Sequence, residues 1–245
     1  MNQNCAIVIP IYKNKLNSDE VFSLKNSLKH LNNYNIYWLT HKNIDINYYI
    51  ENFELNNFKF FDPIYFDSIS GYNKLLTSIK FYEAFLNYQY ILILQTDAIV
   101  LKPELDYWLN ENYDYIGAPW PKGYSYNFLI KDISITEGIN CTTFVGNGGL
   151  SLRNTKSCIN LLNEFADIAS DWQNIGHAED LFYSFMGTIS NHFKLPNIMK
   201  AANFAHDIDP KYLYALNGNK LPFGAHAWEK YDRAHWESLP GWPLA

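Results

Sequence analysis

Two groups of polar side chains in this chain have types and positions that suit chemistry. Gln95-Thr96-Asp97 directly follows the apolar run 90–94, and Glu179-Asp180 opens a segment with helical spacing. A buried carboxylate such as Asp97 needs a partner to offset its desolvation, and a divalent cation that prefers oxygen ligands is one such partner. A carboxylate such as Asp180 acts as a general base when it lies within hydrogen-bond reach of a hydroxyl.

Each candidate also has a structural explanation. Asp97 would turn the chain at the end of a strand, and Glu179-Asp180 would stabilise the first turn of a helix through its dipole. Gly146-Asn-Gly-Gly149 suits either a phosphate-binding loop or a sharp turn, and it lacks the spacing of the known phosphate motifs. His226 is one of seven histidines, and a histidine between aromatic residues is more often a packing residue than a ligand. Taken singly, these signals leave both explanations open.

The first part of the chain alternates between strand and helix patterns. The run Cys5–Pro10 predicts a buried strand that ends at its proline, and Asn17 with Glu20 predicts a capping box before a helix. The alternation implies a largely parallel sheet, and ligands bind beyond the carboxyl ends of such strands, where Asp97 lies. The same patterns predict strands over 35–39, 58–61 and 90–94 and a helix over 72–88.

Beyond residue 101 the pattern changes. A strand is expected over 114–120, ending at Pro119, and residues 121–142 are expected to form a long loop that acts as a mobile lid. A second strand over 144–153 is entered through glycines, and helices begin near 155 and 178. Because no repeat or linker interrupts the chain, residues 1–245 are expected to form a single domain.

Composition excludes several classes of protein. The chain has 245 residues, of which 48% are hydrophobic, and its net charge of −6 without a Lys/Arg cluster argues against a nucleic-acid partner. The three cysteines indicate neither a disulfide framework nor a zinc site. With no secretory signal and no apolar run of about 20 residues, we expect a cytoplasmic protein, with peripheral membrane association left open.

The order of the motifs resembles that of GT-A-fold glycosyltransferases. The strings QTDA, YDYIGAPW, GNGGLSLR, AEDLFYS and PFGAHAW resemble a family of bacterial glycosyltransferases over roughly residues 5–230. The resemblance implies an α/β, GT-A-like (Rossmann-like) fold, in which a mostly parallel central sheet is flanked by helices. Residues of about 1–101 would form the half that binds a nucleotide sugar, and about 102–245 a C-terminal half that binds the acceptor.

The resemblance also implies an activity and roles for individual residues. A sugar would move from a nucleotide-sugar donor to a hydroxyl of a glycan or glycolipid, in the synthesis of surface polysaccharide, capsule or lipopolysaccharide. Asp180 would be the base that takes the acceptor proton, with inversion at the anomeric carbon. The resemblance assigns Asp97, His226 and Gln95 to a Mn²⁺ or Mg²⁺ ion, Pro10, Ile11, Tyr12, Thr96 and Asp97 to the nucleotide sugar, and Trp120, Gly148, Gly149 and Glu179 to the acceptor.

One departure from the family's metal motif and three alternative functions or mechanisms stay open. Gln95 stands where the family has the first Asp of the metal motif, and a neutral amide binds these cations more weakly, so metal dependence is open. A carbohydrate-binding protein without activity would explain the 17% aromatic content. A sugar-phosphate nucleotidyltransferase would need a glycine-rich loop after the first strand, where residues 10–15 have no glycine. A retaining transferase would use Asp180 to hold substrate.

Overall fold

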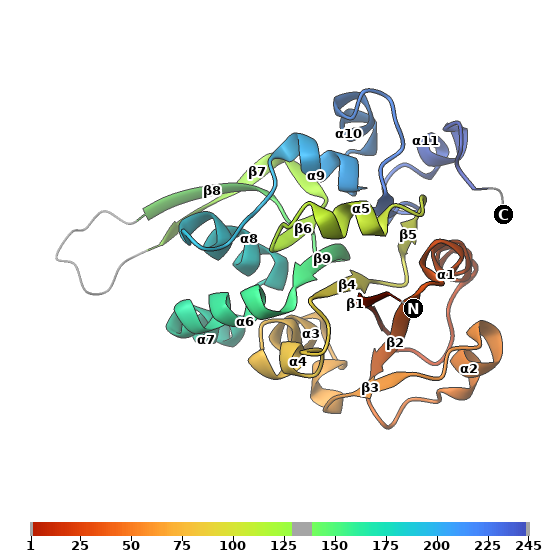
Figure 1. The fold of residues 1–245 in the computed structure, drawn as a ribbon, viewed down its shortest axis with the longest axis horizontal. Coiled ribbons are helices and arrows are strands. Elements are labelled where there is room, and N and C mark those ends of the chain that lie inside the picture. Colours follow the sequence, from red (N-terminus) through yellow and green to blue (C-terminus); the bar gives the residue numbers. More distant parts are fainter. Residues whose placement is uncertain (1, 129–138, 244–245) are drawn as a thin grey trace.

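A six-stranded sheet forms the centre of the molecule (Figure 1). The computed structural model describes residues 2–128 and 139–243. The sheet has the order β3-β2-β1-β4-β9-β6, and the first four of these strands are parallel to one another. β9 is antiparallel to both β4 and β6, so β6 runs in the same direction as β4. The prediction of a mostly parallel α/β sheet is confirmed. The strands are β1 (Asn2–Pro10), β2 (Tyr34–Thr40), β3 (Phe58–Phe60), β4 (Tyr90–Leu94), β6 (Tyr115–Gly117) and β9 (Leu150–Asn154).

Two smaller sheets lie beside the central one. One has the order β10-β11-β5, and the other is an antiparallel ribbon of β7 and β8 that projects from the body of the molecule (Figure 1). Their bounds are β5 (Ala98–Val100), β7 (Pro119–Phe128), β8 (Ile139–Val145), β10 (Ala205–His206) and β11 (Gly224–His226).

The ribbon corrects the prediction of a long loop. Residues 121–128 and 139–142 are paired strands, and the chain enters β7 at Pro119. The sequence pattern missed them because strands of a two-stranded ribbon that buries one side satisfy one another's backbone groups without a continuous apolar run. The strand predicted over 144–153 is also divided, into the end of β8, a turn and β9. Residues 129–138, on which the middle of the predicted lid falls, lie outside the described residues.

The capping box at the first helix is confirmed. Asn17 Oδ1 accepts a hydrogen bond from Glu20 N at 2.9 Å, and Asn17 N donates to Glu20 Oε2 at 2.9 Å. The helices are α1 (Ser18–Leu31), α2 (Asn47–Phe53), α3 (Ile69–Leu76), α4 (Ile79–Glu83), α5 (Leu105–Asn110), α6 (Thr155–Glu164), α7 (Ala166–Ile175), α8 (Glu179–Ile189), α9 (Ile198–Phe204), α10 (Pro210–Leu216) and α11 (Arg233–Ser238), with a 3-10 turn η1 (Pro63–Tyr65).

The single helix predicted over 72–88 is wrong, because two helices, α3 and α4, occupy this region. Thr77 Oγ1 donates to Asn73 O, and Ser78 Oγ donates to Leu75 O. Ser78 Oγ also accepts from Phe81 N, so it caps the new helix. Hydroxyl side chains compete in this way with helical hydrogen bonds, and apolar spacing alone does not reveal the break.

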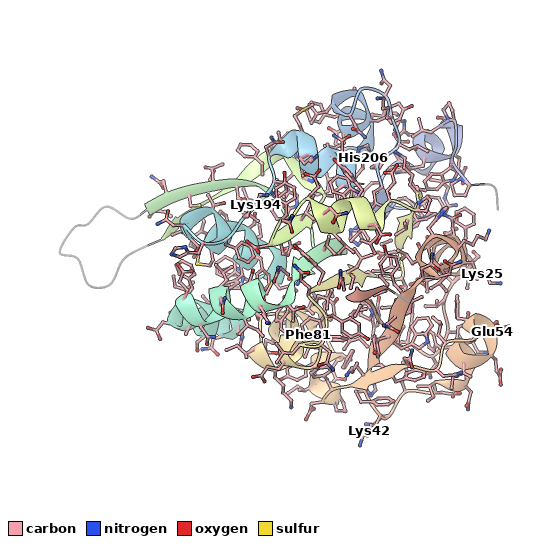
Figure 2. The ribbon with its side chains drawn as sticks, in the orientation of Figure 1. Lys25, Lys42, Glu54, Phe81, Lys194 and His206 are labelled. Atoms are coloured by element: carbon pink, nitrogen blue, oxygen red, sulfur yellow. The ribbon has the colours of Figure 1, made fainter. Side chains whose placement is uncertain are left out.

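Helices cover both faces of the central sheet. Side chains of β1 alternate between them: Ile7 and Ile9 pack in a cluster with α1 and α5, while Ala6 and Val8 pack in a cluster with α3, α4, α6 and α8. Phe81 of this second cluster lies on α4 (Figure 2). Within the described ranges, no helix has the length and apolar character needed to cross a bilayer.

Candidate active site

A cavity of about 620 Å³ opens at the carboxyl ends of β1 and β4. Because β9 is antiparallel to β4, the turn that leads into β9 reaches the same edge of the sheet. The segment 65–73, the start of α8 and the end of β11 complete the wall. The lining residues are Pro10, Tyr12, Tyr65, Phe66, Asp67, Ser68, Ile69, Tyr72, Asn73, Gln95, Thr96, Asp97, Asn147, Gly148, Gly149, Ala178, Glu179, Asp180 and His226.

Most residues expected at the site meet in this cavity, and two do not. Ile11 is 1% exposed and belongs to the core, with its backbone N–H donating to Leu39 O at 2.9 Å. Trp120 is buried and packs edge-on against Tyr124, with ring centroids 4.9 Å apart. The expected residues that line the cavity are Pro10, Tyr12, Gln95, Thr96, Asp97, Gly148, Gly149, Glu179, Asp180 and His226.

His226 connects the expected cation ligands. Its position follows from the pairing of β11 with β5, which sets His226 opposite Ala98, the residue after Asp97. Nε2 of His226 lies 3.3 Å from Asp97 Oδ1 and 3.2 Å from Gln95 Oε1. Burial lowers the pKa of His226, but Asp207 and Asp97 outweigh it and raise the pKa to about 10. Burial likewise raises the pKa of Asp97, and His226 more than offsets this, leaving it below its ordinary value.

The two separations from His226 Nε2 are compatible with ligands of one divalent cation. Neighbouring ligands of an octahedral ion with bonds of about 2.1 Å are about 3 Å apart, close to the separations around Nε2. The other ring nitrogen, Nδ1, lies 3.3 Å from Asp207 Oδ1, as in metal sites where a carboxylate orients the histidine ligand. Across the described residues, no group of three or more His, Cys, Asp and Glu side chains is arranged to hold a metal ion. An amide, Gln95, would therefore be the third ligand here.

Asp180 lies on another wall of the cavity, in the first turn of α8. Its Oδ2 accepts from Gly148 N at 3.1 Å, and its Oδ1 accepts from Leu181 N at 2.8 Å. Burial, reinforced by the charge of Glu179, raises the pKa of Asp180 to about 7, although the two backbone donors act in the opposite direction. A carboxylate with a pKa near neutrality is suited to accept a proton and later release it.

Glu179, the neighbour of Asp180, is held in a buried ion pair. Arg153 of β9 donates to both of its carboxylate oxygens, at 2.8 and 2.9 Å, and neither side chain is more than 5% exposed. The guanidinium also lies over the rings of Tyr115 and Tyr183, at 5.0 and 5.5 Å from their centroids. Glu179 thus fixes the start of α8 against the sheet.

The glycines before β9 allow two of these side chains to approach the backbone. A Cβ on Gly148 would lie 2.2 Å from Glu179 Oε1, and a Cβ on Gly149 would lie 2.2 Å from the ring of His226. The space that the missing side chains leave is therefore occupied by Glu179 and His226, although both glycines still line the cavity.

Sequence reasoning missed several residues that support the site. Glu20, recognised as a helix cap, also accepts from Thr96 Oγ1 at 2.5 Å and pairs with Lys13 Nζ at 2.6 Å. No sequence motif indicated a role for Arg153 or Asp207, because their partners are brought close only by the fold. The capping box indicated Glu20, but not its contact with Thr96, which is 76 residues away.

Solved structures show the class of fold. Mouse xyloside xylosyltransferase 1 in its apo form aligns with a TM-score of 0.54 at 11% identity, covering 90% of this chain and 96% of that chain. The S. cerevisiae mannosyltransferase Ktr4p in complex with GDP aligns with a TM-score of 0.52 at 10% identity, covering 82% of this chain and 68% of that chain. An active-site mutant of LgtC aligns with a TM-score of 0.52 at 13% identity, covering 90% of this chain and 86% of that chain. The fold is that of the GT-A glycosyltransferases.

The family follows from the sequence. A family model described as "Protein of unknown function (DUF5672)" matches residues 56–226, which is most of the chain, and the protein belongs to this family. The matched segment contains the cavity residues from Tyr65 to His226. No curated protein matches the sequence.

Proposed function

We propose that this protein transfers a sugar from a nucleotide-sugar donor to the hydroxyl of an acceptor. The observation that carries the proposal is the convergence of Asp180 and the Asp97–His226 pair on one cavity, at the carboxyl edge of a GT-A-type sheet. One wall thus offers a base and another a site for charge on the leaving group.

In the proposed reaction Asp180 acts on the acceptor. The acceptor oxygen attacks the anomeric carbon, its O–H proton passes to Asp180, and the bond from that carbon to the phosphate oxygen breaks with its electron pair on the nucleoside diphosphate. A base on the face opposite the leaving group implies inversion of the anomeric centre. Gly148 N–H and Leu181 N–H hold the Asp180 carboxylate in place for this step. A retaining enzyme, in which Asp180 only holds substrate, is the alternative mechanism.

The charge of the cavity favours a donor accompanied by a cation. Among the described lining residues, His226 is the single basic side chain, against the carboxyl groups of Asp67, Asp97 and Asp180, while Glu179 is already paired with Arg153. When bound, Mn²⁺ or Mg²⁺ would neutralise charge on the diphosphate. Asp97, Gln95 and His226 would hold it, while the backbone after β1 and the Thr96 segment would contact the nucleoside.

The rim of the cavity favours an acceptor with an apolar part. Ile69, Ile175 and Tyr12 are 82%, 66% and 62% exposed, among the four most exposed large hydrophobic residues of the described chain. Tyr12 and Ile69 line the cavity itself. Ile175 precedes Gly176, whose added Cβ would lie 2.7 Å from Ser70 Oγ, so it borders the start of α3. Apolar surface at an entrance gains free energy when an apolar group covers it, which supports a glycolipid over a free glycan.

A thermal-shift screen tests the donor half of the proposal. The purified protein is heated with UDP, GDP, CDP or CMP, each with Mn²⁺, Mg²⁺ or EDTA, because a ligand that binds the folded state raises the melting temperature. A rise with one nucleotide that EDTA abolishes is the expected result. A rise that survives EDTA would remove the metal role, and no rise with any of them would favour a carbohydrate-binding protein without activity.

Product analysis tests the acceptor half. With the nucleotide identified, its sugar conjugates are incubated with alkyl glycosides and with the same free sugars, and we expect faster transfer to the alkyl glycosides. The anomeric configuration of the product, read by NMR, distinguishes inversion from retention. A role in surface polysaccharide, capsule or lipopolysaccharide synthesis and a cytoplasmic location stay predictions from the sequence.

A further inference from the structure

Asp207, next to His206 of β10, is a buried carboxylate that the proposed reaction does not use (Figure 2 labels His206). It is 3% exposed, and an isolated charge at such depth is costly unless it is hydrogen-bonded. Its Oδ2 accepts from Asn147 Nδ2 at 2.7 Å, and its Oδ1 lies 3.3 Å from His226 Nδ1. Within the described chain, neither that Oδ1 nor that Nδ1 has a hydrogen-bond partner, so the ion-pair contact of 3.3 Å leaves each atom available to the other.

This contact determines what the other side of His226 presents to the cavity. Because Nδ1 faces Asp207, the proton on Nδ1 is the one that this carboxylate holds. Nε2 is therefore the nitrogen at which the ring can give up a proton and offer a lone pair on the side of the cavity where Asp97 and Gln95 lie. The ring cannot turn freely, because it packs directly on the backbone of Gly149.

Asn147 extends the contact to the opposite wall. While its Nδ2 donates to Asp207, its Oδ1 accepts from Gly149 N at 2.9 Å. The adjacent Gly148 N donates to Asp180 Oδ2. One buried carboxylate is therefore linked, through a single turn, to both the cation side and the base side of the cavity.

We infer that Asp207 is a positioning residue, which orients His226 as a cation ligand and holds the glycine turn beside it. The inference rests on the proposed function for the identity of the ligand, a divalent cation. It goes beyond that function by assigning a role to a residue that does not line the cavity.

The substitution Asp207→Asn tests it with little change in shape. Asn147 Oδ1 accepts a hydrogen bond from Gly149 N, so Asn147 must still present its Nδ2 to residue 207. The side-chain amide of the substituted residue 207 must therefore accept that hydrogen bond with its oxygen. Its NH₂ group then faces His226, donates to Nδ1 and forces the proton onto Nε2. The nitrogen that would bind the cation is no longer free.

Two measurements follow, both on the metal-free full chain at first. Titration with Mn²⁺ alone, followed by electron paramagnetic resonance, should give a dissociation constant about 10- to 100-fold higher for the variant, the usual effect of losing a group that orients a ligand. The ¹⁵N spectrum of His226, assigned by loss of its signals in His226→Gln and compared in the neutral state of the ring, should show a protonated Nδ1 in the wild type and an unprotonated Nδ1 in the variant. Asp209→Asn is the matched control, since Asp209 is an exposed carboxylate two residues along that caps α10.

The outcomes separate this inference from the proposed function. Equal Mn²⁺ affinity and an unchanged Nδ1 signal in Asp207→Asn would overturn the inference and leave the transferase proposal standing. A changed Nδ1 signal in a protein whose wild type binds no Mn²⁺ would support the positioning of His226 and remove the metal from the proposed function. Native circular dichroism of the variant, equal to that of the control, excludes global unfolding as the cause.

Discussion

Replacing Asp180 with asparagine should greatly slow transfer and at the same time stabilise the protein at neutral pH. The ordinary pKa of this carboxyl is 3.8, and in the fold it is about 7. Below pH 3.8 the carboxyl group is protonated in both the folded and unfolded states and does not lower the free energy of unfolding. Between the two pKa values the unfolded chain releases the proton while the folded chain keeps it, so stability falls as the pH rises. Above pH 7 the cost is constant.

The size of the effect follows from the shift in pKa. A shift of about three pKa units corresponds to a cost of about 4 kcal/mol in the free energy of unfolding once the group is ionised in both states. Roughly 40% of that cost is present at pH 5 and all of it at pH 8. Asparagine keeps an acceptor for Gly148 N but loses one for Leu181 N, an offset of about 0.5–1.5 kcal/mol that does not depend on pH.

Urea unfolding at pH 5 and pH 8 measures this dependence. Relative to the wild type, Asp180→Asn should gain about 2–3 kcal/mol in unfolding free energy between pH 5 and pH 8, and turnover with a donor and acceptor should fall by about 10²–10⁴-fold. Asp167→Asn, which removes an exposed acid from the first turn of α7, is the control and should show no such gain. An equal stability difference at both pH values would refute the raised pKa, and full turnover would refute the role as base.

Two further predictions concern the residues around Asp180 and His226. Arg153→Met should destabilise the fold by about 3–5 kcal/mol, because it leaves the buried carboxylate of Glu179 without its partner. Urea unfolding should show that adding Glu179→Gln recovers part of this loss, and strictly additive effects would contradict the pairing. Gly149→Ala should weaken Mn²⁺ binding by more than about 10-fold, as lost support for a ligand does, since the new Cβ would lie 2.2 Å from the ring of His226. Calorimetric titration that finds unchanged affinity would mean that the ring is not needed there.

Much of the fold could be predicted because its determinants are local. The buried strand before Pro10 and the box of Asn17 and Glu20 are read from neighbouring residues, and the structure has both. The break at Thr77 and Ser78 is also local, yet it depends on hydroxyl groups that apolar periodicity does not count. The β7–β8 ribbon has no continuous apolar run, since the buried residues of β8, Cys141, Thr143 and Val145, alternate with exposed ones.

For the candidate site, the sequence predicted which positions carry reactive side chains, but not the contacts that hold those side chains in place. Asp97, Asp180 and His226 have chemically capable side chains at element ends, and the sheet brings them to one edge. What the sequence could not reveal is which side chains support them. Arg153 and Asp207 are identified by partners far away in the chain, and contacts of that kind exist only after folding.

The order of strands in the central sheet sets a limit on how the chain can be shortened. The family match begins at residue 56, but β1 lies between β2 and β4, with hydrogen-bonded neighbours on both sides. A recombinant fragment that starts at the family boundary would lose β1 and β2, leave β4 with an open edge and remove Pro10 and Tyr12 from the cavity wall. Expression trials, substrate libraries and comparisons among relatives therefore need the segment upstream of the match, because that segment supplies both a central strand and one side of the pocket.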